Sequence, residues 1–508
     1  MKPRILALWG CGLGAVLLGL IGCASNAEHM ASSSADKPWV PGGDEQKIVW
    51  SLAKPSVPAA QGMADFRIPA NPKLALLAQP VGYDPERVYR LPELIDLAQR
   101  NHPATRVAWQ QARQAALAVG AVEATFLPML SASVIAGRQE LATPLPEVLG
   151  QSLRLDSTEK GSTQILALQW LLFDFGQREA LAAAAKHVAL AANTLFNGSH
   201  QKLIFEVAQA YYMYAATIER HQFARTALDN AVAIQAAVDA RRSQGLATTV
   251  ETAQARQAVA QAKLRMVQTE GQERDAYQVL LASVGVQIPL KLDASEVAAR
   301  TLPAPSSAPL DATIEQALAK RPDVAASYAN LLAGKAAIDA AKADFFPKIY
   351  AAGNLAWGSG RFDAAGLPTI GQQGSGSGVL LGVTLPLFDG GLREARLKGA
   401  KSRAAMAEDE FLRVQTAALT EIIIARNALR TALESHRAAT ELVSAATITY
   451  DAALDAYRNG VGTVDVAMAA NTALIAAREA MMDAHSASLI GAVRLAFMLG
   501  ALTSREGV

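Results

Sequence analysis

The chain contains two copies of one structural unit, and this duplication limits its fold more than any other feature of the sequence. The triplet Phe-Leu-Pro at residues 126–128 recurs as Phe-Phe-Pro at residues 345–347, an offset of 219 positions. Further along, the offset is 215 positions and holds for more than 100 residues, which chance matches do not do, so two tandem repeats are expected. The pairs at the second offset are Phe173-Asp174 with Phe388-Asp389, Arg178-Glu179-Ala180 with Arg393-Glu394-Ala395, Gly245 with Gly460, Thr248 with Thr463, and Gly285 with Gly500.

Long stretches without proline predict very long helices in both copies. No proline occurs between Pro146 and Pro289, nor after Pro386. Since proline breaks helices, each stretch fits a long arm, a turn at a glycine and a returning arm. The first arm, residues 177–244, would be roughly 100 Å long at 1.5 Å per residue. Gly198 and Gly399 are the candidate kinks.

The returning arm of the second copy has small residues at steps of four and three. This spacing keeps them on one face with the 3.5-residue period of a left-handed supercoil. Small side chains let helix backbones approach closely, so the row predicts a tight coiled-coil seam; accidental spacing in an alanine-rich helix is the alternative. The row is Ala473, Ala477, Ala480, Ala484, Ala487 and Gly491.

Each copy also predicts one helix followed by a β-hairpin. In the first copy we expect a single helix over residues 91–125, because apolar residues recur at helical spacing up to the Phe-Leu-Pro triplet. Alternation of polar and apolar residues then predicts strands, and glycine- and serine-rich segments predict long loops between them. The expected strands are 129–136, 163–173, 348–357 and 379–388, with loops at 137–161 and 358–378.

The N-terminus resembles a bacterial lipoprotein signal. Lys2 and Arg4 precede an apolar run at residues 5–21, which is typical of a secretory signal peptide. The run ends in Leu-Ile-Gly followed by Cys23, similar to a lipobox in which this cysteine becomes the lipidated first residue. An ordinary signal with an incidental cysteine is the alternative. Ser25, two residues after this cysteine, resembles the pattern that directs lipoproteins to the outer membrane.

Composition and motif searches argue against several other classes of function. The 508 residues carry a net charge of +1, which gives no electrostatic indication of nucleic-acid binding. Seven histidines are scattered without a His-x-x-x-His pair, so no metal site, cofactor or enzyme activity is expected. After residue 23 no segment reaches the ~20 apolar residues of a membrane helix. Further membrane contact would therefore use strands, and four strands per chain require several protomers to close a barrel.

Together the repeats and local motifs resemble the TolC family of outer-membrane efflux proteins. The motifs are Phe-x-Pro at both helix-to-strand joins, Leu-Phe-Asp-x-Gly at 172–176 and 387–391, and Gln-Gly-Leu-Ala-Thr at 244–248. The resemblance covers residues 90–501 and implies a mainly α fold with membrane β structure. In such a homotrimer, long α-helical coiled-coil hairpins form a periplasmic barrel, and four strands per protomer build a 12-stranded outer-membrane β-barrel.

The resemblance also implies partners, a location and a function. A periplasmic adaptor (membrane fusion protein), an inner-membrane pump and outer-membrane lipid would contact the homotrimer, which would lie in the outer membrane, lipid-anchored, and extend into the periplasm. The channel would export drugs or metal ions passively. Two alternatives remain: the outer-membrane conduit of a type I protein secretion system, and a non-conducting structural coiled-coil lipoprotein. The paired hairpins favour a channel, since a spacer has no use for them.

The expected domain boundaries follow from the repeats and from two segments rich in proline, serine and alanine. They are a signal peptide at 1–22, an N-terminal tether at 23–84, a first repeat at 85–290, a linker at 291–309, a second repeat at 310–501 and a tail at 502–508.

The turns between the long arms are the candidate functional sites. By resemblance they form the periplasmic tip that contacts the adaptor, although both turn glycines also read as helix C-caps. Asp465 lies five residues after Gly460, where the family usually has its gate acid at six, and Ala469 replaces a second acid. The candidate adaptor contacts are Arg242, Gly245, Leu246, Ala247, Thr248, Gly460, Val461, Gly462 and Thr463. The candidate pore-gate acids are Glu251, Asp465, Asp451 and Asp455; for the last two, a solvated outer helix face is the alternative.

Overall fold

The computed structural model describes residues 80–144, 154–298, 300–303, 310–364 and 368–503. The chain divides into the units Met1–Gln79 and Pro80–Val508, and the described residues all belong to the second. The predicted signal peptide, Cys23 and most of the predicted tether therefore lie outside the described residues.

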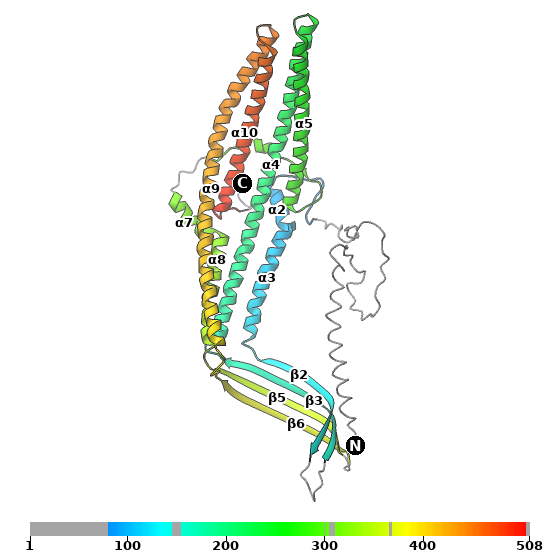
Figure 1. Cartoon of the computed structure of the whole chain (residues 1–508), viewed down its shortest axis with the longest axis vertical. Helices are drawn as coiled ribbons and strands as arrows, with labels where there is room; N and C mark the ends of the chain where they lie inside the picture. The colour runs from blue at the N-terminus through cyan, green and yellow to red at the C-terminus, as the bar shows by residue number, and fades with distance from the viewer. Residues whose placement is uncertain (1–79, 145–153, 299, 304–309, 365–367, 504–508) are drawn as a thin grey trace, which may run out of the picture. The chain divides into compact units, whose positions relative to one another are not determined.

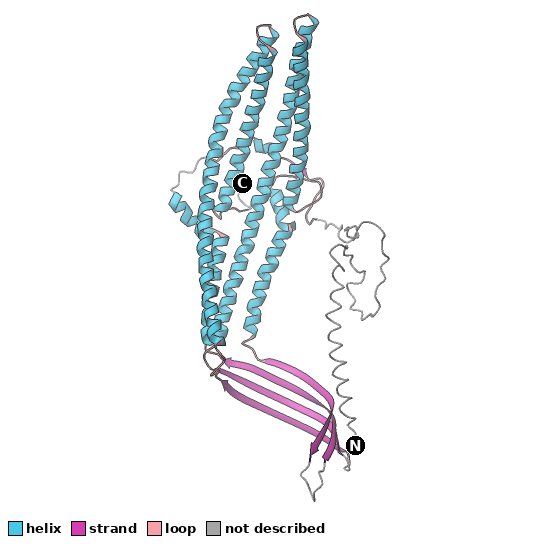
Figure 2. Cartoon of the chain, in the orientation of Figure 1, coloured by secondary structure: helices cyan, strands magenta, loops and turns pink. Residues whose placement is uncertain are grey.

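The two copies have the same order of elements, so the predicted duplication is confirmed (Figure 1). Within the second unit, the four-stranded sheet lies at one end of the helices and the two helical turns at the other (Figure 2). The first copy comprises α2 (Leu91–Asn101), α3 (Pro103–Ala124), β2 (Met129–Pro144), β3 (Arg154–Phe173), α4 (Gln177–Ser243) and α5 (Thr249–Val284). The second comprises α7 (Leu310–Lys320), α8 (Pro322–Ala343), β5 (Lys348–Ala364), β6 (Ile370–Thr384), α9 (Leu392–Arg458) and α10 (Val464–Met498).

A short segment between the copies is also ordered. The strand β4 (Lys291–Leu292) pairs in parallel with β1 (Val88–Tyr89), and α6 (Ser295–Ala298) follows it. Part of the expected linker is thus tied to the start of the first repeat.

The long arms are continuous helices. α4 and α9 each contain 67 residues, roughly 100 Å at 1.5 Å per residue. Gly198 and Gly399 lie inside them without interrupting them. A Cβ atom at Gly198 would lie 3.0 Å from Cβ of Pro322, so this glycine lets the start of α8 pack closely against α4.

The predicted small-residue seam is only partly correct. Ala477, Ala484 and Gly491 are buried and are spaced by seven residues, as a coiled-coil position requires. A Cβ atom at Gly491 would lie 3.3 Å from Cα of Leu429 in α9, which shows how closely these helices approach. The other three alanines, Ala473, Ala480 and Ala487, are exposed in the protomer.

The single helix predicted over residues 91–125 is wrong, because the chain breaks at His102. Pro103 follows this residue and disfavours helical geometry in it, and His102 has an extended backbone with φ −66° and ψ 128°. Its imidazole accepts a hydrogen bond from the backbone N–H of Ala104 and so caps α3. The second copy breaks in the same way at Arg321 between α7 and α8.

The strands are longer than predicted, and most of each predicted loop is wrong. The antiparallel order is β2-β3-β5-β6, with pairing continuous through the glycine-rich segments. Glycine is needed there because neighbouring backbones approach closely: a Cβ atom at Gly161 would lie 2.8 Å from the Ser359 carbonyl oxygen. At the other end, β6 stops at Thr384, before Pro386, rather than at residue 388.

The two faces of the sheet differ in chemistry. Because side chains alternate along a strand, the pairing register defines which residues share a face. One face carries an apolar band with Trp170 and Trp357 near its ends. The opposite face is rich in glycine and polar residues and has a hollow of about 730 Å³ lined in part by Gly161, Gly358, Gly360 and Gly374. The apolar band includes Leu130, Val134, Leu166, Leu168, Leu355, Val379 and Leu381.

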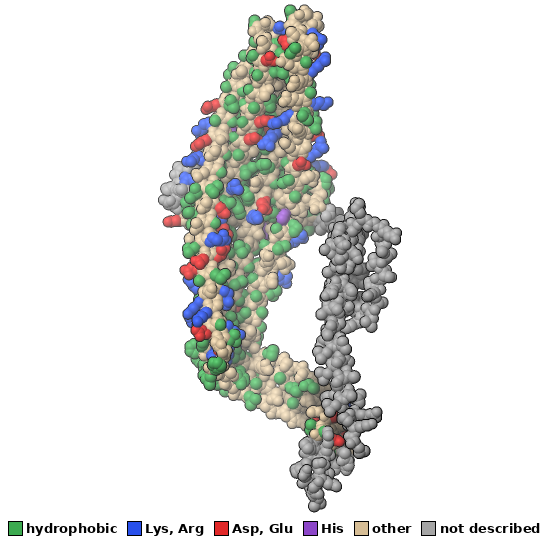
Figure 3. All heavy atoms as spheres, viewed as in Figure 1, with side chains coloured by type: hydrophobic (Ala, Val, Ile, Leu, Met, Phe, Trp, Pro, Cys, Tyr) green, Lys and Arg blue, Asp and Glu red, His purple; other side chains and the backbone are tan. Residues whose placement is uncertain are grey.

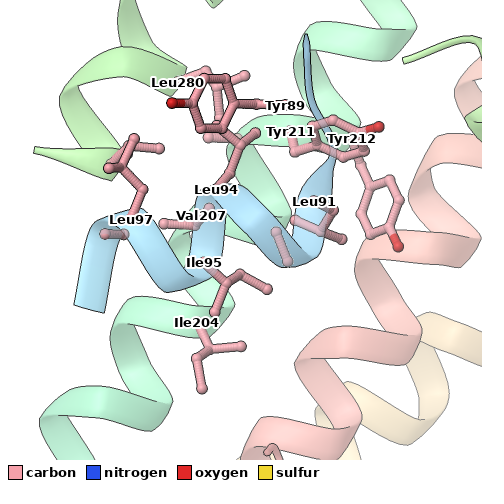
Figure 4. Close-up of a cluster of buried hydrophobic side chains, with 14 of the residues drawn as sticks. Tyr89, Leu91, Leu94, Ile95, Leu97, Ile204, Val207, Tyr211, Tyr212 and Leu280 are labelled. Carbon is pink, nitrogen blue, oxygen red and sulfur yellow. The ribbon is translucent and has the colours of Figure 1, made fainter. Parts of the chain in front are cut away.

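The largest hydrophobic core lies midway along the helices, where α2 and α5 pack on α4. Figure 4 shows Leu94 and Ile95 of α2 facing Val207 and Ile204 of α4. Leu94 is fully buried, so this short amphipathic helix holds the start of the first copy against α4.

Charged side chains are distributed unevenly. Figure 3 shows Lys, Arg, Asp and Glu along the helices and few of them over the visible part of the sheet. Among the residues that the structure describes, no helix is long and apolar enough to cross a membrane. The same ranges bring together no group of three potential metal ligands.

Candidate functional site

The tip of each helical hairpin is a tight turn built on a left-handed glycine. Gly245 has φ +74° and Gly460 has φ +82°, backbone values that residues other than glycine rarely adopt. After α4, the N–H of Gly245 donates to the Arg242 carbonyl and the N–H of Leu246 to the Arg241 carbonyl. The equivalent bonds follow α9, so both turns are Schellman C-caps and the C-cap interpretation of the glycines is confirmed.

The first returning helix begins with a complete capping box. The backbone N–H and the hydroxyl of Thr248 donate to Oε2 of Glu251 at 2.6 and 2.9 Å, and the Glu251 N–H donates to the Thr248 hydroxyl at 3.1 Å. These hydrogen bonds, the backbone one foremost, lower the pKa of Glu251. The carboxylate of Glu251, the gate candidate of the first copy, is thus hydrogen-bonded at the N-terminus of α5.

The second copy lacks this box. Thr463, the N-cap residue of α10, makes no side-chain capping bond. Val466 stands where the first copy has Glu251, so no carboxylate can accept from the Thr463 N–H either. Asp465, in the first turn of α10, is exposed. Asp451 and Asp455 are exposed on α9, and Oδ1 of Asp455 lies 3.8 Å from Nη1 of Arg458. A role of these acids in a pore stays a prediction.

An arginine and a tyrosine that sequence reasoning missed join the two hairpins. Nη1 of Arg241 in α4 donates to the carbonyl oxygen of Tyr457 in α9 at 2.9 Å, and its guanidinium lies 5.0 Å from the centre of the Tyr457 ring. Gly460 permits this approach, since a Cβ atom there would lie 3.3 Å from Nη1 of Arg241.

This contact is partly buried and incompletely hydrogen-bonded. Tyr457 is 1% exposed, and its hydroxyl and Nε of Arg241 have no partner among the described residues. Burial raises the pKa of Tyr457, as does the nearby Glu251, while Arg241 lowers it. The two repeats differ at these positions, with Arg241-Arg242 in one and Ala456-Tyr457 in the other. The difference between the repeats is visible in the sequence, but it does not identify the contact.

Below the tip, apolar side chains from both copies form a common cluster. Ile234 and Val238 of α4 pack with Leu454 of α9 and with Val464 and Leu474 of α10. Beyond the cluster, Leu246 and Val461 at the turns are 62% and 83% exposed. The tip therefore offers small, apolar turn surfaces on a rigid base.

A repeated ion pair at the other end explains the Leu-Phe-Asp-x-Gly and Phe-x-Pro motifs. Nε of Arg178 lies 2.8 Å from Oδ2 of Asp174, and the guanidinium lies over the Phe126 ring. Arg393 repeats the arrangement with Asp389 and Phe345. These contacts fix the joint between strand and long helix in each copy.

Known proteins share this two-copy arrangement. A family model described as outer membrane efflux protein matches residues 94–286 and 313–501, one stretch in each copy. Protein CyaE of Bordetella pertussis is 28% identical over 394 residues, which cover 76% of this chain and 79% of that protein. Outer membrane protein OprJ of Pseudomonas aeruginosa is 26% identical over 378 residues, 73% of this chain and 75% of that protein.

A solved structure agrees with the fold. The crystal structure of a membrane protein from Pseudomonas aeruginosa aligns with a TM-score of 0.66 and 26% identity, over 80% of this chain and 93% of that one. The match of the family model to most of the chain confirms the resemblance that the motifs indicated. The chain therefore belongs to the outer membrane efflux protein family, whose members are efflux channels and not enzymes.

Proposed function

We propose that three copies of this chain form an outer-membrane channel of a tripartite efflux system, which passively exports small molecules such as drugs or metal ions. The observation that carries the proposal is a four-stranded sheet with one apolar face, at the end of helices roughly 100 Å long. Such helices would carry the passage far into the periplasm, toward an adaptor, and no bond is made or broken during transport.

The sheet supports assembly into a trimer. In the order β2-β3-β5-β6, the outer strands β2 and β6 are each paired on one side only. Unpaired backbone groups in lipid cost several kcal/mol each, so both edges need partners. Three protomers would join β2 of one copy to β6 of the next and close a barrel of 12 strands, an even number as in bacterial outer-membrane barrels.

The apolar face supports insertion into lipid. Its band of Leu, Val and Ala side chains runs between Trp170 and Trp357, which are 40% and 50% exposed. Amphipathic aromatic rings are enriched where a barrel crosses the two membrane interfaces. The glycine-rich and polar opposite face would then line the pore, and its hollow would widen the passage.

The tip supports docking of a periplasmic adaptor, with the inner-membrane pump beyond it. Exposed Leu246 and Val461, on turns fixed by Schellman bonds, would give an adaptor two similar sites per protomer. Arg242, Ala247, Thr248, Gly462 and Thr463 complete these surfaces. We keep Asp451, Asp455, Asp465 and Glu251 as proposed gate acids, and Cys23 as the proposed lipid anchor.

The channel proposal is tested by purifying the mature chain in detergent and reconstituting it in a planar bilayer. A trimer with stepwise single-channel conductance is expected. A monodisperse monomer that gives no conductance would refute the proposal. Lipidation is tested separately: Cys23→Ala should lose palmitate labelling, and unchanged labelling would remove the anchor.

A further inference from the structure

Three cations lie side by side across the far end of the sheet, on the same face as the apolar band. We propose that this row, Arg138, Lys160 and Arg361, binds the phosphate groups of an outer-leaflet lipid. The inference rests on the proposed function, because it requires the apolar face of the sheet to contact the membrane.

The pairing register places the three side chains together. Arg138 of β2 is directly opposite Lys160 of β3, which is directly opposite Arg361 of β5. Directly opposed residues share a face of the sheet, and their Cβ atoms lie about 4.5–5.5 Å apart. All three side chains are exposed.

The same alternation aligns the row with the apolar band. Along β5, Arg361 shares its face with Trp357 and Leu355; along β3, Lys160 shares its face with Leu166 and Leu168. No register shift interrupts this part of either pairing, since the one irregularity lies at Leu171 to Phe173.

The depth of the row matches a lipid headgroup. Arg361 is four residues beyond Trp357, about 13 Å along a strand that rises about 3.3 Å per residue. Barrel strands tilt by about 35–45°, so the distance along the membrane normal is shorter. Since tryptophan marks the membrane interface, the cations would lie among the headgroups on the side away from the helices.

Two of the three cations in the row have no ion-pair partner of their own among the described residues. Like charges opposite each other repel, so three neighbouring cations favour an anion. Arg138 is paired with Glu140, but within the part of the chain that the structure describes neither Lys160 nor Arg361 has an ion-pair partner. Asp363, one pair further along the same face, accepts a hydrogen bond from the hydroxyl of Thr369.

The chemistry fits a lipid phosphate better than free phosphate. Guanidinium and ammonium groups bind phosphate oxygens through charge-assisted hydrogen bonds. An open row of flexible side chains does not enclose a free ion. A lipid held beside the apolar band brings its phosphates to the row at high effective concentration.

The test measures binding of a bisphosphorylated glycolipid, lipid A, to the full-length protein in a neutral detergent by native mass spectrometry. The double variant Lys160→Gln/Arg361→Gln should bind roughly 10- to 30-fold more weakly, since each cation near a lipid surface contributes ~1 kcal/mol. The charge-preserving variant Lys160→Arg/Arg361→Lys should retain binding and shows that the sheet is intact. The matched control Lys401→Gln/Arg403→Gln removes two exposed cations of α9 and should bind normally.

Three results would overturn the inference: unchanged binding by the double glutamine variant, equal binding of dephosphorylated lipid A, or displacement of the lipid by equimolar inorganic phosphate. Conductance in bilayers of neutral phosphatidylcholine separates this inference from the proposed function. A channel that conducts there but binds lipid A independently of the row refutes only the lipid site. A protein that forms no trimer and no pore refutes the channel.

Discussion

Arg241 of α4 donates a hydrogen bond across 2.9 Å to the backbone carbonyl of Tyr457 in α9, with its guanidinium over the tyrosine ring. The bond runs from the first copy to the second, one turn before the tip glycine on each side. It therefore holds the two hairpins at the end where an adaptor would dock and where the pore would close.

Replacing Arg241 by alanine is expected to loosen the tip. The variant loses a charge-assisted hydrogen bond and a cation–π contact, together worth about 2–4 kcal/mol. Amide hydrogen exchange in residues 457–463 should accelerate, and the open probability of the channel should rise. Arg256→Ala is the matched control, because Arg256 is exposed on α5 and should leave exchange at the tip unchanged. Equal rates of amide hydrogen exchange at the tip in Arg241→Ala and Arg256→Ala would show that Arg241 does not hold the two hairpins together.

The capping box predicts a pH-dependent role for Glu251. Its pKa is lowered in the folded chain by the backbone and hydroxyl of Thr248, so the stabilisation is present above the usual glutamate value and is lost as the pH falls through the folded value. Glu251→Ala should destabilise the first hairpin by about 0.3–1 kcal/mol at pH 7. Urea unfolding of both proteins at pH 7 and at pH 3 measures this. If the parent chain and Glu251→Ala still differ by the same unfolding free energy at pH 3, the Glu251 carboxylate is not the source of the stabilisation.

Gly500, at the end of the returning arm α10, should not tolerate alanine. A Cβ atom at Gly500, where φ is +66°, would lie 2.9 Å from the Lys320 carbonyl oxygen. Gly500→Ala is expected to destabilise by more than about 1 kcal/mol, from strain and from this contact. Gly120→Ala, within α3 and with no neighbour inside 4 Å, should instead stabilise by about 0.5–1 kcal/mol. The two midpoints of thermal unfolding should therefore shift in opposite directions.

The repeated ion pair predicts unequal effects of one substitution in the two copies. Arg178 is 8% exposed and donates to Asp174 and to the carbonyls of Thr125, Leu171 and Leu172. Lysine cannot reproduce this fork of hydrogen bonds, so Arg178→Lys should destabilise by about 3 kcal/mol. Arg393→Lys, at a more exposed pair, should destabilise less. Equal unfolding midpoints for the two variants would contradict this ranking.

Sequence patterns predicted the helices well and the sheet poorly, for physical reasons. The proline-free stretch, the Leu-Phe-Asp-x-Gly motif before it and the turn glycine Gly245 after it are all explicit in the sequence, so α4 was predicted to within one residue. Strand length was underestimated because Gly161 and Gly358 look like loop residues, whereas they serve close contact between strands. That requirement depends on the neighbouring strand, which the local sequence does not contain.

At the tip, too, local features could be predicted from the sequence and long-range contacts could not. The C-cap glycines Gly245 and Gly460 were predictable, since their role is local. The contact between Arg241 and Tyr457 joins residues 216 positions apart, and only packing of the two hairpins brings them together.

Burial of His485 predicts that acid destabilises the helical core. The residue is 6% exposed, its Nε2 lies 3.2 Å from the Arg300 carbonyl oxygen, and its Nδ1 has no hydrogen-bond partner among the described residues. Burial lowers its pKa and the neighbouring His436 lowers it further, while the Arg300 carbonyl and Glu219 oppose the shift. The unfolded chain therefore binds a proton more readily than the folded one, and stability falls as the pH drops below about 6.5.

His485→Gln should flatten the dependence of the urea midpoint between pH 7 and pH 5. Some slope should remain, because burial also lowers the pKa of His200. An unchanged slope in the variant would mean that His485 is not among the groups that take up the proton on unfolding.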